Sequence, residues 1–134
     1  MNDCIFCQIV GGKIPAYIVD ENDHVVVIIT RENHPLVITK KHIPDVYSLD
    51  DASACAVMRE AVRIARAVKS GLRCDGVNLV QSNGSTAGQD VFHFHLHIKP
   101  RYDRDTVTLS WEHEHQPEET RRATMDAIKN ALLD

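Results

Sequence analysis

The chain has 134 residues, which predicts a single domain over residues 1–134 with a hydrophobic core of ordinary size. Its hydrophobic content of 43%, charged content of 25% and net charge of −4 are typical of a globular protein and exclude a broad basic surface for nucleic acid. With no apolar run near the roughly 20 residues of a membrane span, no recognisable signal peptide and four cysteines, we expect a cytoplasmic protein without membrane association.

Short extended segments, rich in β-branched residues and bounded by turn residues, predict the strands of a sheet. They lie at residues 18–20, 24–29, 36–39, 77–81, 92–98 and 106–111. A tight turn at 21–23 joins the first two, and Pro35 precedes the third. Residues 4–10 form another short apolar stretch, which Gly11 and Gly12 end.

Two helices are predicted, one near the middle of the chain and one at its end. The first runs from about 51 to 70, with Ser48 and Asp50 as candidate N-caps and Gly71 as its stop. Its buried stripe is predicted from helical spacing: Met58, Ala61, Val62, Ala65 and Val68. The second begins at Pro117 and runs to about Leu132. Sequential strands with helices at intervals predict an α+β fold with an antiparallel sheet.

Histidine alternates with apolar residues in the segment 92–98. Because side chains alternate along a strand, His93, His95 and His97 are predicted to share one face, with neighbouring rings about 7 Å apart. The intervening side chains are predicted to point into the core: Phe92, Phe94, Leu96 and Ile98. This spacing is too wide for three rings to bind one zinc ion. It favours a nucleophilic imidazole with a second imidazole beside it, and an inert polar surface is the alternative.

The loop at 83–90 and the Cys4–Cys7 pair are weaker signals. Backbone N–H groups of the loop can bind an anion that Gly84 and Gly88 allow to approach closely, although an ordinary turn has the same composition. Cys4 and Cys7 have the spacing of two zinc ligands, and a reduced pair without metal is the alternative.

Taken together, these segments resemble the histidine triad (HIT) family in its Hint-like bacterial branch. The stretches that carry the resemblance are 4–10, 13–15, 34–38, 41–43, 83–84, 88–89, 93–97 and 100–102. The resemblance implies a five-stranded antiparallel sheet with one long helix and a C-terminal helix. It also implies a homodimer in which the two sheets join.

The resemblance implies hydrolysis of purine nucleoside phosphoramidates or related conjugates at the α-phosphate, releasing a nucleoside monophosphate. His95 matches the nucleophile that forms a nucleotidyl-histidine, His97 the phosphate contact that assists the leaving group, and His34 a histidine that supports the triad. No catalytic metal is required. A dinucleoside polyphosphate hydrolase is one alternative, and a zinc-stabilised nucleotide-binding or adaptor protein with weak or no catalysis is another. A nucleotidyltransferase is disfavoured because that branch usually has Gln in place of His97.

The resemblance also implies two groups of binding residues. For the substrate, they are Asn83, Gln89 and Asp90 around the phosphate and Ile5, Phe6, Ile9 and Ile14 in an apolar slot for the base. For a structural zinc ion, they are Cys4, Cys7, His42 and His93. Ordinary core packing is the alternative interpretation of the four apolar residues.

Three positions depart from the family pattern. Relatives often place an Asp for the ribose hydroxyls between the second and third strands, where this chain is shorter and offers Thr30, Glu32 or Asn33 instead. Asp90 stands where serine is common, which puts an acid near the phosphate. Lys99 replaces a hydrophobic residue and is a candidate for an extra anion contact or an exposed strand end.

Overall fold

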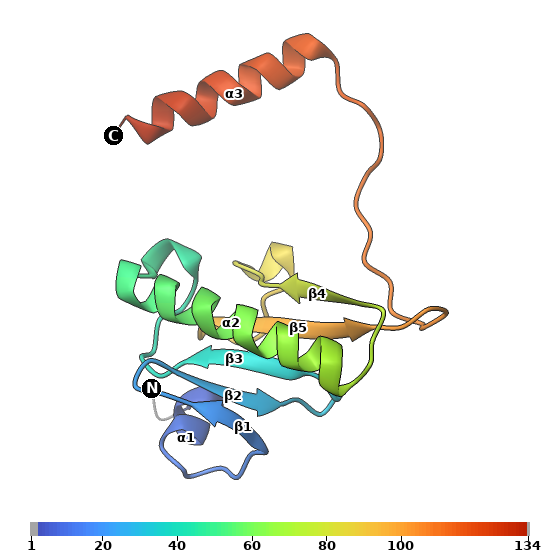
Figure 1. Cartoon of the computed structure of the whole chain (residues 1–134). Helices are drawn as coiled ribbons and strands as arrows, with labels where there is room; N and C mark the ends of the chain where they lie inside the picture. Colours follow the sequence, from blue (N-terminus) through green and yellow to red (C-terminus); the bar gives the residue numbers. More distant parts are fainter. Residues whose placement is uncertain (1–2, 134) are drawn as a thin grey trace.

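A five-stranded antiparallel sheet forms the centre of the computed structural model, which describes residues 3–133 (Figure 1). Its strands are β1 (Ile18–Glu21), β2 (Val25–Ile29), β3 (Pro35–Thr39), β4 (Gly76–Val80) and β5 (His95–Arg101). The order across the sheet is β1-β2-β3-β5-β4, so β5 pairs with both β3 and β4. The last strand of the chain is therefore an interior strand, and the histidines on it lie near the middle of the sheet.

The three α-helices are α1 (Ile5–Val10), α2 (Asp51–Gly71) and α3 (Glu118–Leu132). Asp50 is the N-cap of α2, because its carboxylate accepts the backbone N–H of Ser53 at 2.8 Å. Ser48 instead ends a short 3₁₀ turn before the helix. The predicted α+β fold is confirmed, and α1 is an addition that the apolar stretch 4–10 did not identify as a helix.

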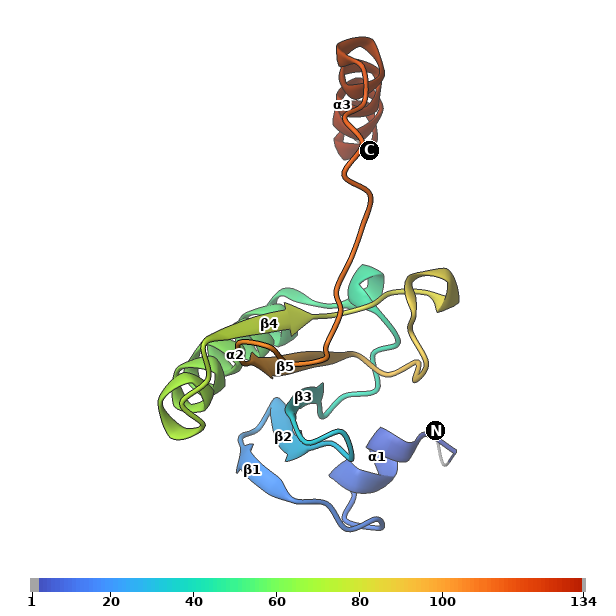
Figure 2. The same ribbon diagram turned by 90° about the vertical axis from the view of Figure 1, so that its right-hand side faces the viewer.

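Helices cover both faces of the sheet (Figure 2). Because side chains alternate along β2, Val25 and Val27 pack on the α2 side, whereas Val26 and Ile28 pack on the side of Phe6 in α1. Phe94, Leu96 and Ile98 also lie in the α2 layer, as predicted. The histidines between them are thereby directed toward α1.

The buried stripe of α2 lies about one residue away from its predicted position. Val57, Ala61, Ile64 and Val68 are buried, whereas Met58 and Val62 are 53% and 39% exposed. The prediction for Ala61 and Val68 was correct and that for Met58 and Val62 was wrong. Both sets have helical spacing, and only the position of the sheet decides which one is covered.

Two predicted extended regions also differ from the structure. β5 begins at His95 and not at residue 92, and Phe92 is 49% exposed because the chain bends before the strand. Residues 106–111 form no strand, since this segment leaves the sheet and has no pairing partner. It leads to α3, which stands away from the sheet and has no buried residue (Figures 1 and 2). Within residues 3–133, no helix is long and apolar enough to cross a membrane.

Candidate active site

His95 and His97 occupy the first and third positions of β5, on the side of the sheet that α1 covers. Their ring centroids are 5.2 Å apart, closer than the predicted 7 Å, because the two rings are tilted against each other at 71°. The ring of Phe6 lies 5.0 Å from His95 and 5.8 Å from His93. All three histidines therefore point to the same side, although His93 precedes the strand.

The ring of His95 is fixed by a main-chain hydrogen bond. Its Nδ1 lies 2.7 Å from the carbonyl oxygen of His93, which can only accept, so Nδ1 carries the proton. Nε2 is then left with a free lone pair. The nearest acid is Asp90, whose Oδ1 lies 3.8 Å from this nitrogen, beyond hydrogen-bond distance. The side chain of His95 is 7% exposed and that of Asp90 is 84% exposed, so the acid stands at the open side of the ring.

His97, His34 and Thr30 form a chain of hydrogen bonds behind the site. His97 Nδ1 lies 2.9 Å from His34 Nε2, and His34 Nδ1 lies 3.3 Å from Thr30 Oγ1. Burial, assisted by the nearby charges of His95 and His34, lowers the pKa of His97 to about 4. Burial and then the charge of Lys99 lower the pKa of His34. Both rings are therefore neutral at pH 7, so one nitrogen donates and the other accepts in the bond between them.

Gln89 and Asn83 use their amides within the protein. Gln89 is buried; its Nε2 donates to the carbonyl oxygens of Pro44 and Val91 at 2.7 and 3.1 Å, and its Oε1 accepts the N–H of Gly84 at 2.8 Å. Asn83 exchanges hydrogen bonds with the amide of Gln81 and accepts the N–H of Val46 at 2.8 Å. These hydrogen bonds fix the conformation of the loop at residues 83–90, which carries Asp90. Direct contact of either amide with a phosphate stays a prediction.

The loop offers fewer free backbone donors than its glycines suggest. The N–H groups of Ala87 and Gln89 donate to the carbonyl oxygen of Gly84, and that of Gly88 donates to Ser85. Gly84 and Gly88 have φ values of 90° and 94°, a left-handed backbone that favours glycine and closes the loop on itself. Their first role is thus to form the turn that precedes β5.

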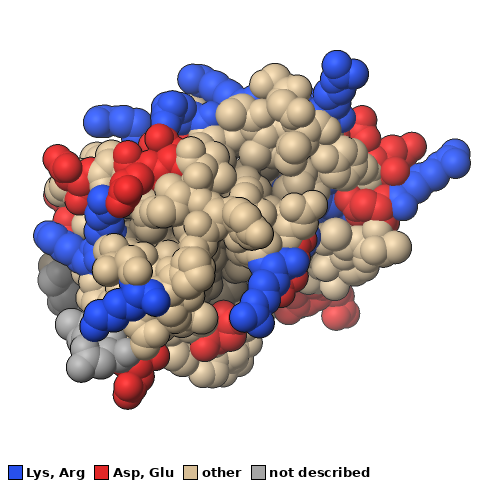
Figure 3. All heavy atoms as spheres, turned by 90° about the horizontal axis from the view of Figure 1, so that it is seen from below, with Lys and Arg blue, Asp and Glu red and all other residues tan. Residues whose placement is uncertain are grey.

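A cavity of about 630 Å³ borders α1, within the size range of small-molecule sites. Its lining is largely apolar and includes Ile5, Phe6, Ile9, Ile14, Ile28 and Leu36. The structure thus brings together the four residues predicted for a base slot, and the 42% exposure of Ile5 shows that the slot is open. Figure 3 views the molecule from this side, where the surface is hollowed among uncharged residues. Tyr17, Thr30 and Arg31 are the residues of the lining that carry polar groups, and Arg31 is its charged member.

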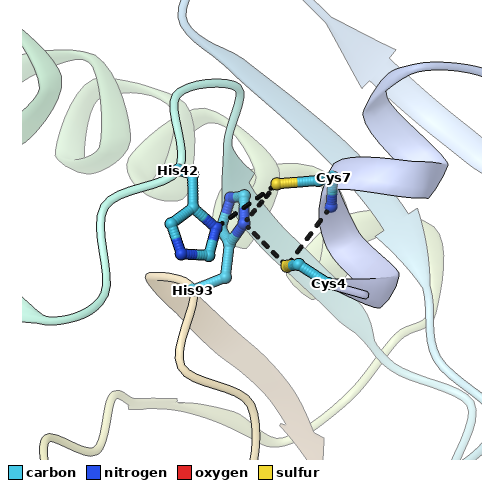
Figure 4. A group of neighbouring side chains, drawn as sticks. All are labelled: Cys4, Cys7, His42 and His93. Carbon is cyan, nitrogen blue, oxygen red and sulfur yellow. Dashed lines mark hydrogen bonds between the residues drawn. The ribbon is translucent and has the colours of Figure 1, made fainter. Parts of the chain in front are cut away.

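Four side chains, those of Cys4, Cys7, His42 and His93, converge from the N-terminal end of α1, the segment after β3 and the segment before β5 (Figure 4). One ligand atom from each lies within 4.8 Å of all the others. The two sulfur atoms lie 3.3 and 3.5 Å from His93 Nδ1, and Cys7 Sγ lies 3.3 Å from His42 Nδ1. Tetrahedral zinc, with bonds of about 2.3 Å to sulfur and 2.0 Å to nitrogen, separates such ligand atoms by about 3.6 Å. The set therefore fits a four-coordinate metal ion.

The hydrogen bonds of His93 prepare it for this role. Its Nε2 lies 2.6 Å from the carbonyl oxygen of Thr39, so Nε2 donates its proton and Nδ1 presents a lone pair to the sulfur atoms. His93 is fully buried. Since its own carbonyl oxygen holds His95, the metal cluster and the candidate nucleophile share one residue.

Sequence reasoning missed three contributors to the site. These are the hydroxyl of Thr30 as the partner of His34, the carbonyl oxygen of Thr39 as the partner of His93, and Arg31 in the cavity wall. The first two depend on how strands pair. A chain position in a polar turn gives no signal that its side chain borders a cavity.

Comparisons with known proteins identify the family of the chain. Residues 11–104 match the HIT domain family. The chain is 36% identical over 135 residues to Protein hit of Bacillus subtilis, covering 95% of this chain and 93% of that protein. It is 34% identical over 113 residues to adenosine 5′-monophosphoramidase HNT1 of Saccharomyces cerevisiae, covering 81% of this chain and 69% of that protein. The chain is also 34% identical over 113 residues to adenylylsulfatase HINT3 of Arabidopsis thaliana, covering 81% of this chain and 57% of that protein.

Solved structures are similar over nearly the whole chain. A HIT family protein from Bacillus anthracis has a TM-score of 0.88 and 35% identity, covering 97% of both chains. A Zn-bound histidine triad family protein from Mycobacterium smegmatis has a TM-score of 0.72 and 34% identity, covering 97% of this chain and 98% of the other.

Proposed function

The chain belongs to the HIT family, and we propose that it is a nucleotide hydrolase that cleaves purine nucleoside phosphoramidates or related nucleotidyl conjugates at the α-phosphate. The observation that carries the proposal is His95. Its Nδ1–H is held by a main-chain carbonyl, its Nε2 has a free lone pair, and its ring contacts the same Phe6 that lines the apolar cavity. A base in that cavity brings the α-phosphate of the same nucleotide toward Nε2.

In the first step, Nε2 of His95 attacks the α-phosphorus and the bond to the leaving group breaks. The leaving nitrogen or oxygen takes the bonding electrons and a proton from His97. His97 is neutral in the free protein, with its pKa at about 4, and the negative charge of a bound phosphate raises that pKa so that the ring can carry the proton. The carbonyl of His93, bonded to Nδ1–H, stabilises the charge on the nucleotidyl-histidine.

In the second step, water attacks phosphorus and the phosphorus–Nε2 bond breaks, returning its electrons to His95. His97 takes the proton of the water, which restores both rings. The sum is one water consumed and one nucleoside monophosphate and one protonated leaving group formed. His34 acts as a positioning residue, because its hydrogen bond to His97 Nδ1 sets the direction of that ring.

A metal ion fits this scheme as a structural element. Cys4, Cys7, His42 and His93 would hold it, and a closed set of four protein ligands leaves no position for a substrate. When bound, a zinc ion would balance the negative charge of the two thiolates and would link α1 to the segment that precedes β5. The cysteines and histidines of the cluster therefore act on the reaction only through the position of His95.

The test is hydrolysis of adenosine 5′-phosphoramidate, followed by chromatography of released AMP. We expect His95→Ala to lower kcat by at least 1,000-fold while leaving the circular dichroism spectrum and the melting temperature near those of the parent. His113→Ala, which removes an exposed histidine of the C-terminal segment, is the matched control and should keep full activity. Unchanged turnover in His95→Ala would refute the mechanism. Tight AMP binding without turnover in the parent would support the adaptor or binding protein instead.

A dinucleoside polyphosphate hydrolase is the second candidate, and Lys99 is the observation that favours it. Its charge lies close enough to His34 and His97 to lower the pKa of both rings, and it forms no ion pair among residues 3–133. An unpaired lysine beside the leaving group favours an anionic one. A higher kcat/KM for diadenosine polyphosphates than for the phosphoramidate would select this candidate.

A further inference from the structure

The hairpin turn between β2 and β3 is closely fixed by its own hydrogen bonds. The N–H of Thr30 donates to the carbonyl oxygen of His34 at 2.9 Å, and the N–H of Asn33 donates to that of Thr30 at 3.0 Å. Thr30 Oγ1 also accepts the N–H of His34 at 3.3 Å. Asn33 takes the left-handed conformation, with φ of 68°, as short hairpin loops require. The backbone of Arg31, inside this turn, therefore has a defined place.

Arg31 is a positive charge without a partner at the edge of an apolar cavity. Its side chain is exposed and lines the cavity, and the lining contains no Asp or Glu. Among residues 3–133 it forms no ion pair, even with its neighbour Glu32. Other exposed arginines also lack an ion pair in the described part of the chain, but among the arginines only Arg31 lines this cavity. An unpaired guanidinium in a binding cavity favours an anionic group on the ligand.

The position of the turn indicates which part of a nucleotide meets Arg31. Thr30, the residue before it, bonds to His34, and His34 bonds to His97. The cavity wall that contains Arg31 thus continues into the histidine cluster. With a base in the cavity and the α-phosphate at His95, the sugar lies between them and passes along this wall.

We propose that Arg31 forms a second anion subsite that binds a phosphate on the sugar, so that the preferred substrates are conjugates of nucleosides phosphorylated at the 2′ or 3′ position. The proposal rests on the proposed function for the orientation of the nucleotide. The chemistry has a precedent in dinucleotide-binding folds, where a carboxylate accepts hydrogen bonds from a free ribose hydroxyl and an arginine accommodates a phosphate on the sugar. The described lining of this cavity has the arginine and lacks the carboxylate.

Calorimetric titration of the whole protein with AMP, adenosine 3′,5′-bisphosphate and adenosine 2′,5′-bisphosphate tests the subsite without any turnover, because none of the three carries a leaving group on its α-phosphate. We expect adenosine 3′,5′-bisphosphate or 2′,5′-bisphosphate to bind about tenfold more tightly than AMP at low ionic strength, and the difference to shrink with added salt. The bisphosphate whose affinity exceeds that of AMP by more identifies whether the sugar phosphate lies at the 2′ or the 3′ position. The ratio of the AMP dissociation constant to the bisphosphate dissociation constant measures this preference. Arg31→Ala should bring the ratio near one, Arg31→Lys should keep part of the preference, and Arg31→Glu should bring the ratio below one.

Arg66→Ala is the matched control, because it removes an equal charge from the exposed side of α2, on the opposite face of the sheet. It should leave the ratio unchanged. An equal ratio in the parent and in Arg31→Ala would overturn the proposal. So would an Arg31-dependent gain for ADP that matches the gain for the bisphosphates, since this would place the anion on the 5′ chain.

Kinetics separate this inference from the hydrolase proposal. Adenosine 5′-phosphoramidate and its 3′-phosphorylated form are compared by kcat/KM in the parent and in Arg31→Ala. Turnover of both without preference would overturn the subsite alone. Arg31-dependent binding of the bisphosphate without any turnover would overturn the hydrolase and leave the subsite standing.

Discussion

The imidazole of His97 is held neutral by its surroundings, and this has a consequence for folding. Burial, with the charges of His95 and His34, sets its pKa at about 4, below the ordinary value of 6.5. Between these two values the unfolded chain binds more protons than the folded one. The contribution of neutral His97 to the free energy of unfolding is therefore complete above about pH 6.5, and it is lost progressively as the pH falls toward 4.

We predict that His97→Gln weakens this dependence. Thermal unfolding of the parent and the variant at pH 4.5, 5.5 and 7.0 is the measurement. Between pH 7.0 and 4.5, the melting temperature of the parent should fall further than that of the variant, because Gln does not bind a proton in this range. Parallel losses in the two proteins would contradict the assigned pKa of His97.

At the scale of single elements, the sequence predicted what depends on local periodicity. Five of the six predicted extended segments overlap a strand, and α3 was located from Pro117, which directly precedes it. The buried stripe of α2 was displaced, since Val57 and Met58 satisfy helical spacing equally and the sheet decides between them. Arg31 was missed for a similar reason, because the cavity beside its turn is formed by segments far away in the sequence.

A metal ion bound by the Cys4, Cys7, His42 and His93 cluster would link α1 to the segment before β5, and removal of the ion should destabilise both. We predict about one zinc ion per chain in protein purified under reducing conditions without chelator, measured by elemental analysis. A strong chelator should lower the melting temperature and the rate of AMP release, because α1 and His93 lose their common anchor. Cys7→Ser should lose the metal, whereas Cys55→Ser, on the exposed surface of α2, should retain it. Reduced parent protein without metal would exclude the zinc site.

At the scale of the whole molecule, α3 is a helix without a covering surface. None of its side chains is buried, and Met125, Ile128 and Leu132 are 43%, 56% and 77% exposed. An isolated helix of 15 residues is marginal in water, since most helical stability comes from packing of its apolar face. A second copy of the chain can supply that packing, which supports the homodimer that the family resemblance implies.

The free edges of the sheet indicate how two copies would join. β1 has four residues and an irregular register between Ile18 and Asp20, features that hinder pairing with another strand. β4 has five residues in regular register with β5, and Leu79 on it is 44% exposed. We therefore predict a dimer in which β4 of one copy pairs with β4 of the other.

Light scattering after size exclusion should give twice the mass of one chain for the parent. Leu79→Arg should give a single chain, because the two-fold symmetry of a β4 interface brings the introduced charges together. Val19→Arg, the same change at an exposed position of β1, should leave the dimer intact. A parent that elutes as a single chain at micromolar concentration would exclude the dimer, and a reversed response of the two variants would assign the interface to β1.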